Sequence, residues 1–185
     1  MDYGSRFSHQ IVERLRELQV HCELHNWNSP AENVMEMQPQ GFILSGSPES
    51  AYAPGSPHLP EYVLASNLPI LGICFGMQLL AHQLGGKVQK AEKPEYGLVH
   101  ITITAQNPLL TSKDDEVWMS HADRVSVLPP GFYTFATTEN CPIAAFADTQ
   151  RRIYGLQLHP EVPQTPHGKD ILERFTQNIC QIIPK

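Results

Sequence analysis

The fold is decided by residues 68–80, where a short apolar run meets a helical pattern at one cysteine: Leu68-Pro69-Ile70-Leu71-Gly72-Ile73-Cys74-Phe75-Gly76-Met77-Gln78-Leu79-Leu80. Residues 68–73 are apolar and contain a proline near their start, which is typical of a buried parallel strand. Residues 75–84 carry apolar side chains at helical spacing and stop at Gly85, which predicts a helix. Cys74 is therefore expected in the turn between a strand and a helix.

Gly72 and Gly76 flank this cysteine. They allow the chain to bend sharply and to lift the thiol above the sheet edge, as the strand-to-helix turn of a hydrolase does for its serine. The following helix directs N–H groups and a positive dipole end at the sulfur, which favours the thiolate. The N–H of Phe75 is placed to stabilise an oxyanion on the atom that Cys74 attacks. The alternative is that Cys74 is a small buried hydrophobic residue, the usual role of a free cysteine.

The composition indicates one α/β domain. The 185 residues are 41% hydrophobic and 17% charged, as in ordinary globular proteins. No apolar run approaches the roughly 20 residues that a membrane span needs. Residues 1–6 lack the apolar core of a signal peptide, so the chain is expected in the cytoplasm. The net charge of −6, with scattered positive residues, argues against nucleic acid as a partner.

The four cysteines are expected to be free thiols. Cys22, Cys74, Cys141 and Cys180 have no paired C-x-x-C spacing, which argues against a zinc site and against a disulfide framework. Cys22 and His25 have the residue types of half a metal site, but the sequence offers no second half. No metal is therefore predicted in this chain.

Helices and strands are expected on both sides of the Cys74 turn. The periodicity predicts helices over 8–18, 59–65 and 168–182. Strands are expected at 20–25, 41–45, 68–73, 86–91, 97–104, 116–120, 133–138, 143–148 and 152–158. Because strands outnumber helices beyond the Cys74 helix, a parallel unit followed by antiparallel strands is predicted.

The loop at 46–50 follows the expected strand at 41–45. Pro48 prevents this loop from forming a helix, and ligand sites of parallel sheets gather where strands end, with loop N–H groups free to face an anion. The alternative for this stretch is a plain turn.

A second group of reactive side chains follows the strand expected at 152–158. His159 leaves the sheet at its carboxyl edge, Pro160 blocks continuation of the strand, and Glu161 can turn back toward the imidazole. A lone histidine at a strand end is more often a structural residue. Together, however, Cys74, His159 and Glu161 have the residue types of a nucleophile, a base and an orienting carboxylate.

These motifs resemble those of a known family. Residues 72–78, Gly-Ile-Cys-Phe-Gly-Met-Gln, with His159-Pro160-Glu161 downstream, are similar to the class I (triad) glutamine amidotransferases. The resemblance implies a flavodoxin-like α/β fold, with helices on both faces of a mostly parallel sheet and an antiparallel extension. It covers nearly the whole chain, so residues 1–185 are expected to form one glutaminase domain. Within the family, three stretches resemble the glutaminase domains of GMP synthases: 117–123, 138–146 and 153–162.

The resemblance also implies a role for each matching residue. Cys74 would form a γ-glutamyl thioester, His159 would move the proton, and Glu161 would hold His159 in place. The amino-acid end of glutamine would be bound by Gln78, Gly46 and the backbone of Ser120 and His121, and the oxyanion by N–H groups of Phe75 and Ser47.

Several positions depart from the family pattern. Ser47 stands where the loop usually has a second glycine, which reduces the backbone freedom beside the oxyanion. Ala122, Pro94 and Gln164 also replace common residues, in loops expected to face a partner. The family's first strand should precede Asp2, so the domain is expected to lack most of it.

The implied activity is glutamine hydrolysis that supplies ammonia to a GMP synthetase, which aminates xanthosine monophosphate (XMP). The sequence has no nucleotide-binding fingerprint, so ATP and Mg²⁺ are expected in the synthetase (ATP-pyrophosphatase) domain or subunit and no cofactor in this chain. One alternative is a free-standing hydrolase of another γ-glutamyl substrate. Another is an idle interaction module, against which the joint retention of Cys74, His159 and Glu161 argues.

Overall fold

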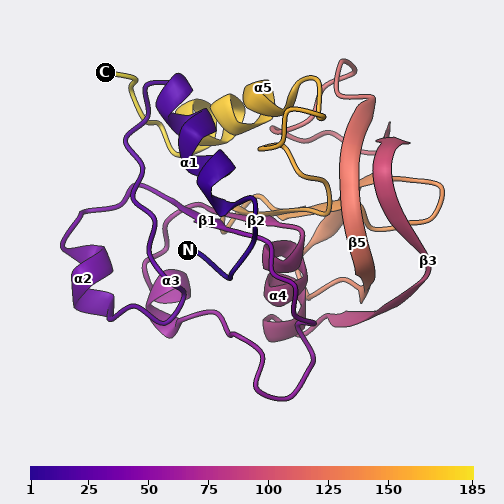
Figure 1. The fold of residues 1–185 in the computed structure, drawn as a ribbon, viewed down its shortest axis with the longest axis horizontal. Helices are drawn as coiled ribbons and strands as arrows, with labels where there is room; N and C mark the ends of the chain where they lie inside the picture. Colours follow the sequence, from indigo (N-terminus) through magenta and orange to yellow (C-terminus); the bar gives the residue numbers. More distant parts are fainter.

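A six-stranded mixed sheet runs through the centre of the computed structural model, which describes residues 1–185 (Figure 1). The first three strands in the sheet are parallel, and the remaining three pair antiparallel. In spatial order the strands are β1 (Phe42–Leu44), β2 (Ile70–Ile73), β8 (Ile153–Leu156), β7 (Ala145–Asp148), β6 (Tyr133–Thr137) and β4 (Thr102–Ile103). The predicted mixed α/β fold, with a parallel unit followed by antiparallel strands, is confirmed.

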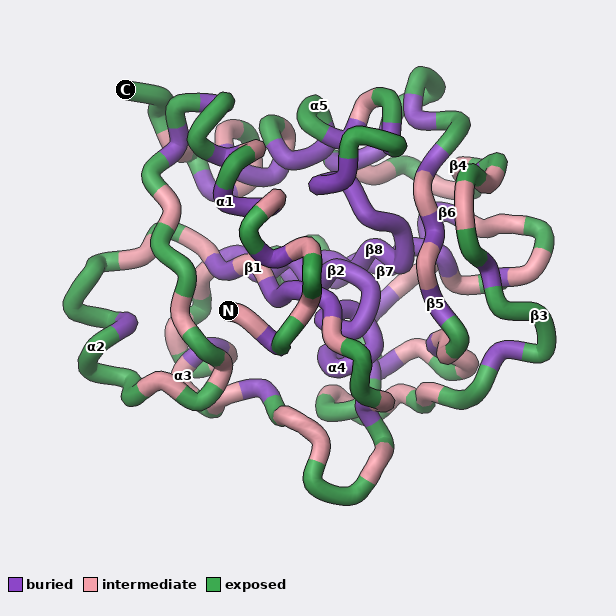
Figure 2. Tube along the Cα trace, viewed as in Figure 1, coloured by how far each residue is buried: buried purple, intermediate pink, exposed green.

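Helices cover both faces of this sheet. Alternate residues of β2 face opposite sides of the sheet. Leu71 and Ile73 belong to one hydrophobic core cluster, and Ile70 belongs to the other. The interior that they form is the purple centre of Figure 2. The first layer holds α1 (Ser8–Glu17) and α5 (Gly168–Glu173), which a π-helix (Arg174–Ile179) continues, and the second holds α3 (Glu61–Ala65) and α4 (Phe75–Gln83). A further short helix, α2 (Ala31–Met35), was not expected from the sequence.

Two long strands, β3 (Lys87–His100) and β5 (Glu116–Val127), form a separate antiparallel sheet beside the main one (Figure 1). The prediction of separate strands at 86–91 and 97–104 is wrong at their boundary, because β3 runs through Pro94. The pairing register shifts between Lys90 and Glu95, so a bulge accommodates the proline within the strand. The strand expected at 116–120 also continues seven residues further than predicted, to Val127.

The predicted strand at 20–25 does not form. This segment makes no strand pairing, and only its neighbour Asn26 bridges Asp2. The first residues of the chain lie next to β1 instead: the Met1 amino group donates to the Ile43 carbonyl at 2.7 Å, and the Ser45 N–H donates to the Met1 carbonyl at 3.1 Å. The alternation of 20–25 is correct for a strand, but an extended segment becomes one only where a neighbour pairs with it.

No helix of this fold combines the length and apolar character that crossing a bilayer requires.

Candidate active site

The carboxyl ends of β2 and β8 bring two predicted residues together. The strands are parallel neighbours with Ile73 opposite Leu156, so the chain leaves the sheet at the same edge after each of them. Cys74 comes directly after β2, and His159 comes three residues after β8. The structure therefore places the thiol and the imidazole side by side above one edge of the sheet.

Cys74 has a backbone conformation that L-residues rarely adopt, with φ +53° and ψ −106°. Such a residue stores roughly 1–3 kcal/mol of strain, which the surrounding structure must hold. The tight turn expected at Cys74 is thus present, but the flanking glycines serve a different purpose from the one predicted. A Cβ on Gly72 would overlap the backbone at Gly76, and a Cβ on Gly76 would overlap the Leu44 carbonyl. The glycines permit close packing of β1, β2 and α4, while the cysteine itself takes the strained angle.

His159 and Glu161 form a buried pair. Nδ1 of His159 lies 2.8 Å from Oε1 of Glu161, and the two side chains are 4% and 0% exposed. Burial lowers the pKa of His159, but the neighbouring Glu161 and Cys74 charges outweigh it, and the pKa stands well above its ordinary value. Nε2 of His159 is buried and makes no hydrogen bond. The arrangement leaves one imidazole nitrogen held by the carboxylate and the other free for proton transfer.

Contacts around the His159 ring restrict its orientation. Thr165 Oγ1 donates to the His159 carbonyl at 2.6 Å, and the Phe7 ring packs edge-on against the imidazole, with centroids 5.2 Å apart. The Arg14 side chain donates to the Glu161 carbonyl at 3.2 Å, so α1 also holds this segment. The imidazole is thereby held by the N-terminal segment, by α1 and by the loop that follows His159.

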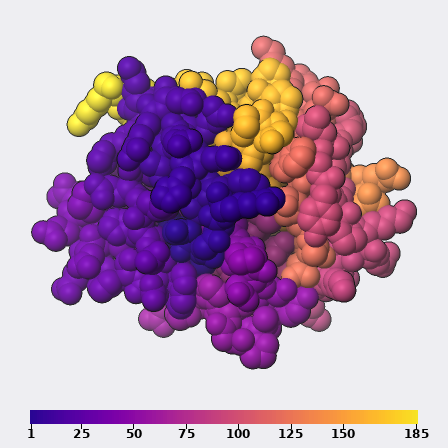
Figure 3. All heavy atoms as spheres, viewed as in Figure 1, coloured from indigo at the N-terminus to yellow at the C-terminus, as the bar shows by residue number.

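A cavity of about 690 Å³ opens above Cys74. Figure 3 shows the indigo N-terminal segment reaching the pink and coral β3–β5 sheet on this side of the molecule. Gly46 does not line the cavity but lies beside the imidazole, since a Cβ there would stand 3.6 Å from His159 Cε1. Glu161 lies behind His159 and does not reach the cavity. The predicted residues that line the cavity are Cys74, His159, Ser47, Phe75, Gln78, Ser120 and His121.

Gln78 lies on α4 with its side-chain amide turned inward. Its Nε2 donates to the Asp123 carbonyl at 2.9 Å and to Gln157 Oε1 at 3.1 Å, so both amide hydrogens are used within the protein. Only Oε1 of Gln78 remains to accept a hydrogen bond from a ligand. The predicted contact of Gln78 with substrate would therefore be a hydrogen bond that Oε1 accepts.

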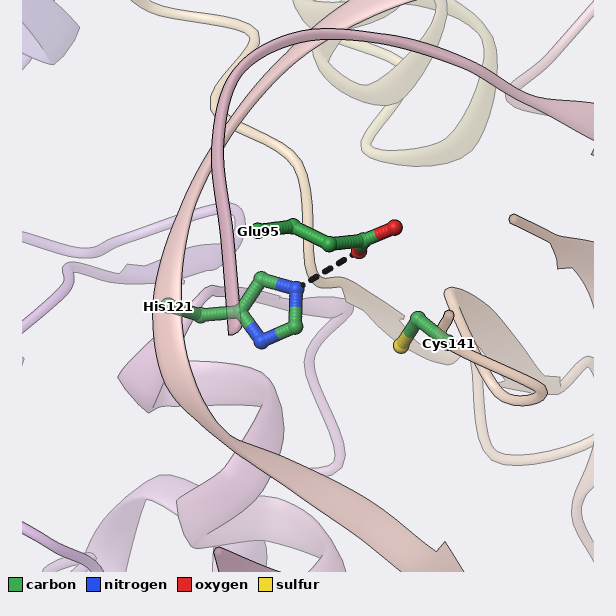
Figure 4. Close-up of side chains that lie close together, drawn as sticks. All are labelled: Glu95, His121 and Cys141. Carbon is green, nitrogen blue, oxygen red and sulfur yellow. Dashed lines mark hydrogen bonds and ion pairs between the residues drawn. The ribbon is translucent and has the colours of Figure 1, made fainter. Parts of the chain in front are cut away.

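The His121 side chain is held in a buried ion pair. Its Nε2 lies 2.8 Å from Glu95 Oε2 (Figure 4), and its Nδ1 lies 2.8 Å from the Asp123 carbonyl. Burial raises the pKa of Glu95, but hydrogen bonds from His121 and Thr138 outweigh this and lower the pKa. The pair ties β5 to β3, so the backbone at Ser120 and His121 is fixed along the wall of the cavity.

Glu95, His121 and Cys141 have the donor types of a metal site, and their donor atoms lie within 4.8 Å of one another (Figure 4). Each donor is already engaged. Burial raises the pKa of Cys141 to about 12, and its thiol donates to the Ile143 carbonyl at 3.3 Å. A metal would have to displace the His121–Glu95 pair and a thiol proton, so these residues fit a structural role better than a metal site.

Sequence reasoning missed three contributors to this site. Gln157 is fully buried with Nε2 at 3.5 Å from Cys74 Sγ, Glu95 anchors His121, and the loop at 4–7 forms part of the cavity wall. Gln157 was detectable in principle, because it stands two residues before His159 and strand side chains alternate. Nothing in the sequence pointed to Glu95, whose partner is 26 residues away.

A second cavity, of about 390 Å³, lies between α1, β1 and the C-terminal residues. None of the predicted site residues lines it, and its lining is largely apolar. The candidate active site is therefore the cavity above Cys74, where the reactive groups converge.

The chain is similar to known proteins over nearly its whole length. Residues 1–179 match the family model described as glutamine amidotransferase class-I. The chain is 45% identical over 190 residues to a GMP synthase (glutamine-hydrolyzing) of Idiomarina loihiensis, covering 97% of this chain and 36% of the relative. It is 48% identical over 184 residues to the enzyme of the same description from Dehalococcoides mccartyi, covering 97% and 34%. The chain thus spans about a third of the length of these curated relatives.

Solved structures show the same fold. A Thermoplasma acidophilum protein assigned as a subunit of GMP synthase superposes with a TM-score of 0.81 at 29% identity, covering 98% of this chain and 92% of that one. A glutamine amidotransferase from Thermotoga maritima superposes with a TM-score of 0.73 at 18% identity, covering 94% and 92%. The second likeness concerns the fold alone.

Proposed function

The chain belongs to the class I glutamine amidotransferase family, and we propose that Cys74, His159 and Glu161 are the catalytic triad with which it hydrolyses glutamine to glutamate and ammonia. One observation carries this proposal: the strained Cys74 and the His159–Glu161 pair meet at a single sheet edge beneath a cavity. A nucleophile, a base and a group that orients the base are the parts that acyl transfer through a covalent intermediate requires.

In the first half of the reaction, the proton of the Cys74 thiol already resides on His159, in keeping with the raised pKa of this imidazole, and the thiolate sulfur attacks the amide carbon of glutamine. The carbonyl oxygen becomes an oxyanion, which the N–H groups of Phe75 and Ser47 stabilise by hydrogen bonding. The imidazolium returns its proton to the leaving nitrogen, the C–N bond breaks, and ammonia departs. A γ-glutamyl thioester remains on Cys74.

In the second half, His159 takes a proton from water, and the resulting hydroxide attacks the thioester carbon. The tetrahedral intermediate collapses, the C–S bond breaks, and Cys74 regains its proton from His159 as glutamate leaves. Glu161 accepts the Nδ1–H of His159 and stabilises the imidazolium in each half. The 2.8 Å contact between Nδ1 and Oε1 supports this role, because it leaves Nε2 as the nitrogen that faces the reacting atoms.

The remaining wall of the cavity would hold the amino-acid end of glutamine. Ser120 and His121 line it, as do Ser47 and Pro48. Gln78 would contribute through Oε1, since its hydrogens are taken. The buried Glu95–His121 pair supports this assignment, because it fixes the position of the backbone that would contact the substrate.

The ammonia would supply a GMP synthetase domain or subunit that aminates XMP with ATP and Mg²⁺. Support comes from the curated relatives, which are named GMP synthase and of which this chain spans about a third. The alternative is a free-standing hydrolase of another γ-glutamyl compound, with the departures at Ala122 and Pro94 reflecting a different substrate.

An ammonia-release assay separates the two functions. The protein is given glutamine or a series of other γ-glutamyl amides, with and without a GMP synthetase and its substrates. Preference for glutamine, together with GMP formation when the synthetase is added, supports the proposal. Faster release from another γ-glutamyl amide and no GMP would favour the free-standing hydrolase. His159→Ala serves as the inactive reference.

A further inference from the structure

Gln157 lies beside Cys74 and Gln78, with no solvent-exposed surface. Its Nε2 is 3.5 Å from Cys74 Sγ, and its Oε1 accepts a hydrogen bond from Gln78 Nε2 at 3.1 Å. A buried amide is costly unless its donors and acceptors are satisfied. The side-chain amide of Gln157 is hydrogen-bonded to two residues of the proposed site. One of these partners is the reacting sulfur of Cys74.

The direction of these hydrogen bonds is determined by Asp123. Its backbone carbonyl can only accept, so the amide group of Gln78 that lies 2.9 Å away must be the NH₂. The same NH₂ faces Gln157, which must therefore present its oxygen to Gln78. The NH₂ of Gln157 is consequently the group that faces Cys74 Sγ, and it donates a hydrogen bond to the sulfur.

The far end of this chain of amides reaches the cavity rim. The Asp123 carboxylate accepts hydrogen bonds from Ser50 Oγ at 2.5 Å and from Tyr52 Oη at 3.1 Å. The loop that carries Ser50 is thereby connected to the sulfur through Asp123, Gln78 and Gln157. None of these links requires a ligand.

The Ser120 carbonyl, also next to the sulfur, has the opposite effect on the protonation of the thiol. The Ser120 carbonyl lies 3.6 Å from Cys74 Sγ and can accept the thiol hydrogen, so it favours the neutral form. A donated N–H favours the anion, because hydrogen bonds to charged groups are about twice as strong as neutral ones. Gln157 is thus the neutral donor that opposes the Ser120 carbonyl at the nucleophile.

We propose that Gln157 assists the triad by donating a hydrogen bond to Cys74 Sγ. This hydrogen bond stabilises the Cys74 thiolate and holds the sulfur toward the substrate. The effect on catalysis rests on the proposed function, in which Cys74 hydrolyses glutamine. The geometry explains why Gln157 and His159 occur on one segment. Backbone hydrogen bonds from Gln157 to Ala144 and from His159 to Trp118 anchor that segment, so both groups are delivered to the sulfur together.

The test is the rate at which a small haloacetamide alkylates Cys74 across a range of pH, measured beside glutamine hydrolysis. Gln157→Leu keeps the approximate volume and removes the donor, and we expect alkylation at neutral pH to slow by about ten- to a hundredfold, with the pH profile moved upward. Gln157→Glu keeps the shape and faces the sulfur with a carboxylate, so its loss should exceed that of Gln157→Leu. Gln150→Leu, at an exposed turn, is the matched control.

Each outcome decides the inference. An unchanged alkylation profile in Gln157→Leu overturns it, as does a smaller loss in Gln157→Glu than in Gln157→Leu, which would indicate packing alone. If Gln157→Leu fails to fold, as circular dichroism would show, the same profile is measured on Gln157→Met, which also lacks the donor. Failure of the proposed function would look different: the wild type would release no ammonia from glutamine while Cys74 alkylation still depended on Gln157.

Discussion

The backbone N–H of Cys74 donates to the carbonyl of Leu156 at 2.7 Å. This hydrogen bond extends the β2–β8 pairing by one residue beyond the end of β2. It joins the turn that carries the nucleophile to the strand end that leads to His159. Sheet pairing, one of the most rigid parts of an α/β fold, therefore positions the thiol relative to the segment that carries the imidazole.

Cys74→Ala should abolish glutamine hydrolysis, whereas Glu161→Ala should retain measurable activity. The nucleophile is indispensable to a covalent mechanism, while the carboxylate only orients and stabilises His159. Losses of about 10⁴- to 10⁶-fold are expected for Cys74→Ala and a clearly smaller factor for Glu161→Ala. Steady-state ammonia release measures both, with the half-buried Cys22 changed to alanine as the control. Equal residual activity in the two variants would remove Cys74 from its assigned role.

A glutamine-like chloroketone should label Cys74 in preference to the other cysteines. Burial raises the pKa of Cys141 and of Cys180 to about 12, and burial also raises the pKa of Cys22, so all three remain thiols. Cys74 alone stands at a helix N-terminus beside a histidine. Mass spectrometry of tryptic peptides identifies the adduct, and its main location on Cys141, Cys180 or Cys22 would contradict the assignment.

The free energy of unfolding should fall as pH rises above the ordinary histidine pKa of about 6.5. Burial lowers the pKa of His159, but the Glu161 and Cys74 charges raise it by more than burial lowers it. The folded-state pKa therefore lies above the unfolded one. The folded protein then binds more protons in this range, and the stability from the charged imidazole is lost as pH passes through the folded-state pKa.

Urea unfolding of wild type and His159→Gln at several pH values checks this linkage. The fall should be smaller in His159→Gln, while His100→Gln, at an exposed position on β3, should behave like wild type. An equal fall in His159→Gln would show that other groups cause the pH dependence.

Gly76→Ala should destabilise the fold and reduce activity together. Its Cβ would overlap the Leu44 carbonyl, so α4 must move away from β1, carrying the Phe75 N–H out of position. A loss of about 3 kcal/mol is expected, at the upper end of typical overpacking. Gly55→Ala is the control: its φ is +78° and no atom lies within 4 Å of an added Cβ, so only a backbone cost of about 1 kcal/mol is expected, without loss of activity. Similar losses in both variants would contradict the close-packing argument.

The isolated chain should hydrolyse glutamine slowly, and a GMP synthetase with bound nucleotides should raise kcat by about 10²- to 10³-fold. Ser47 lies in a loop where its Oγ accepts the Glu49 N–H at 3.2 Å, so a shift of this loop on docking can align the second oxyanion donor. Because that contact forms only in the transition state, kcat should change more than KM. Steady-state kinetics with and without the synthetase measure the effect, and the synthetase without nucleotides is the control. A lone chain that already works at the full rate would show a preformed oxyanion site.

The sequence by itself was sufficient for the parts of the molecule that depend on local chemistry. The strand-to-helix change at Cys74, the strand end before His159 and the carboxylate of Glu161 were all readable, because each is encoded within a few neighbouring residues. Since parallel strands gather their carboxyl ends at one edge, the sequence also predicted that these groups would meet. Their meeting is a geometric finding, and their catalytic roles stay predictions.

Tertiary structure decided whatever depends on a distant partner. The segment 20–25 alternates like a strand but joins no sheet, and β3 passes Pro94 because β3 itself bulges where it pairs with β5. In the same way, the direction of the Gln157 amide follows from the Asp123 carbonyl through Gln78, across more than 30 residues of sequence. Local propensity cannot specify such contacts, since each exists only after chain segments that are remote in sequence have packed together.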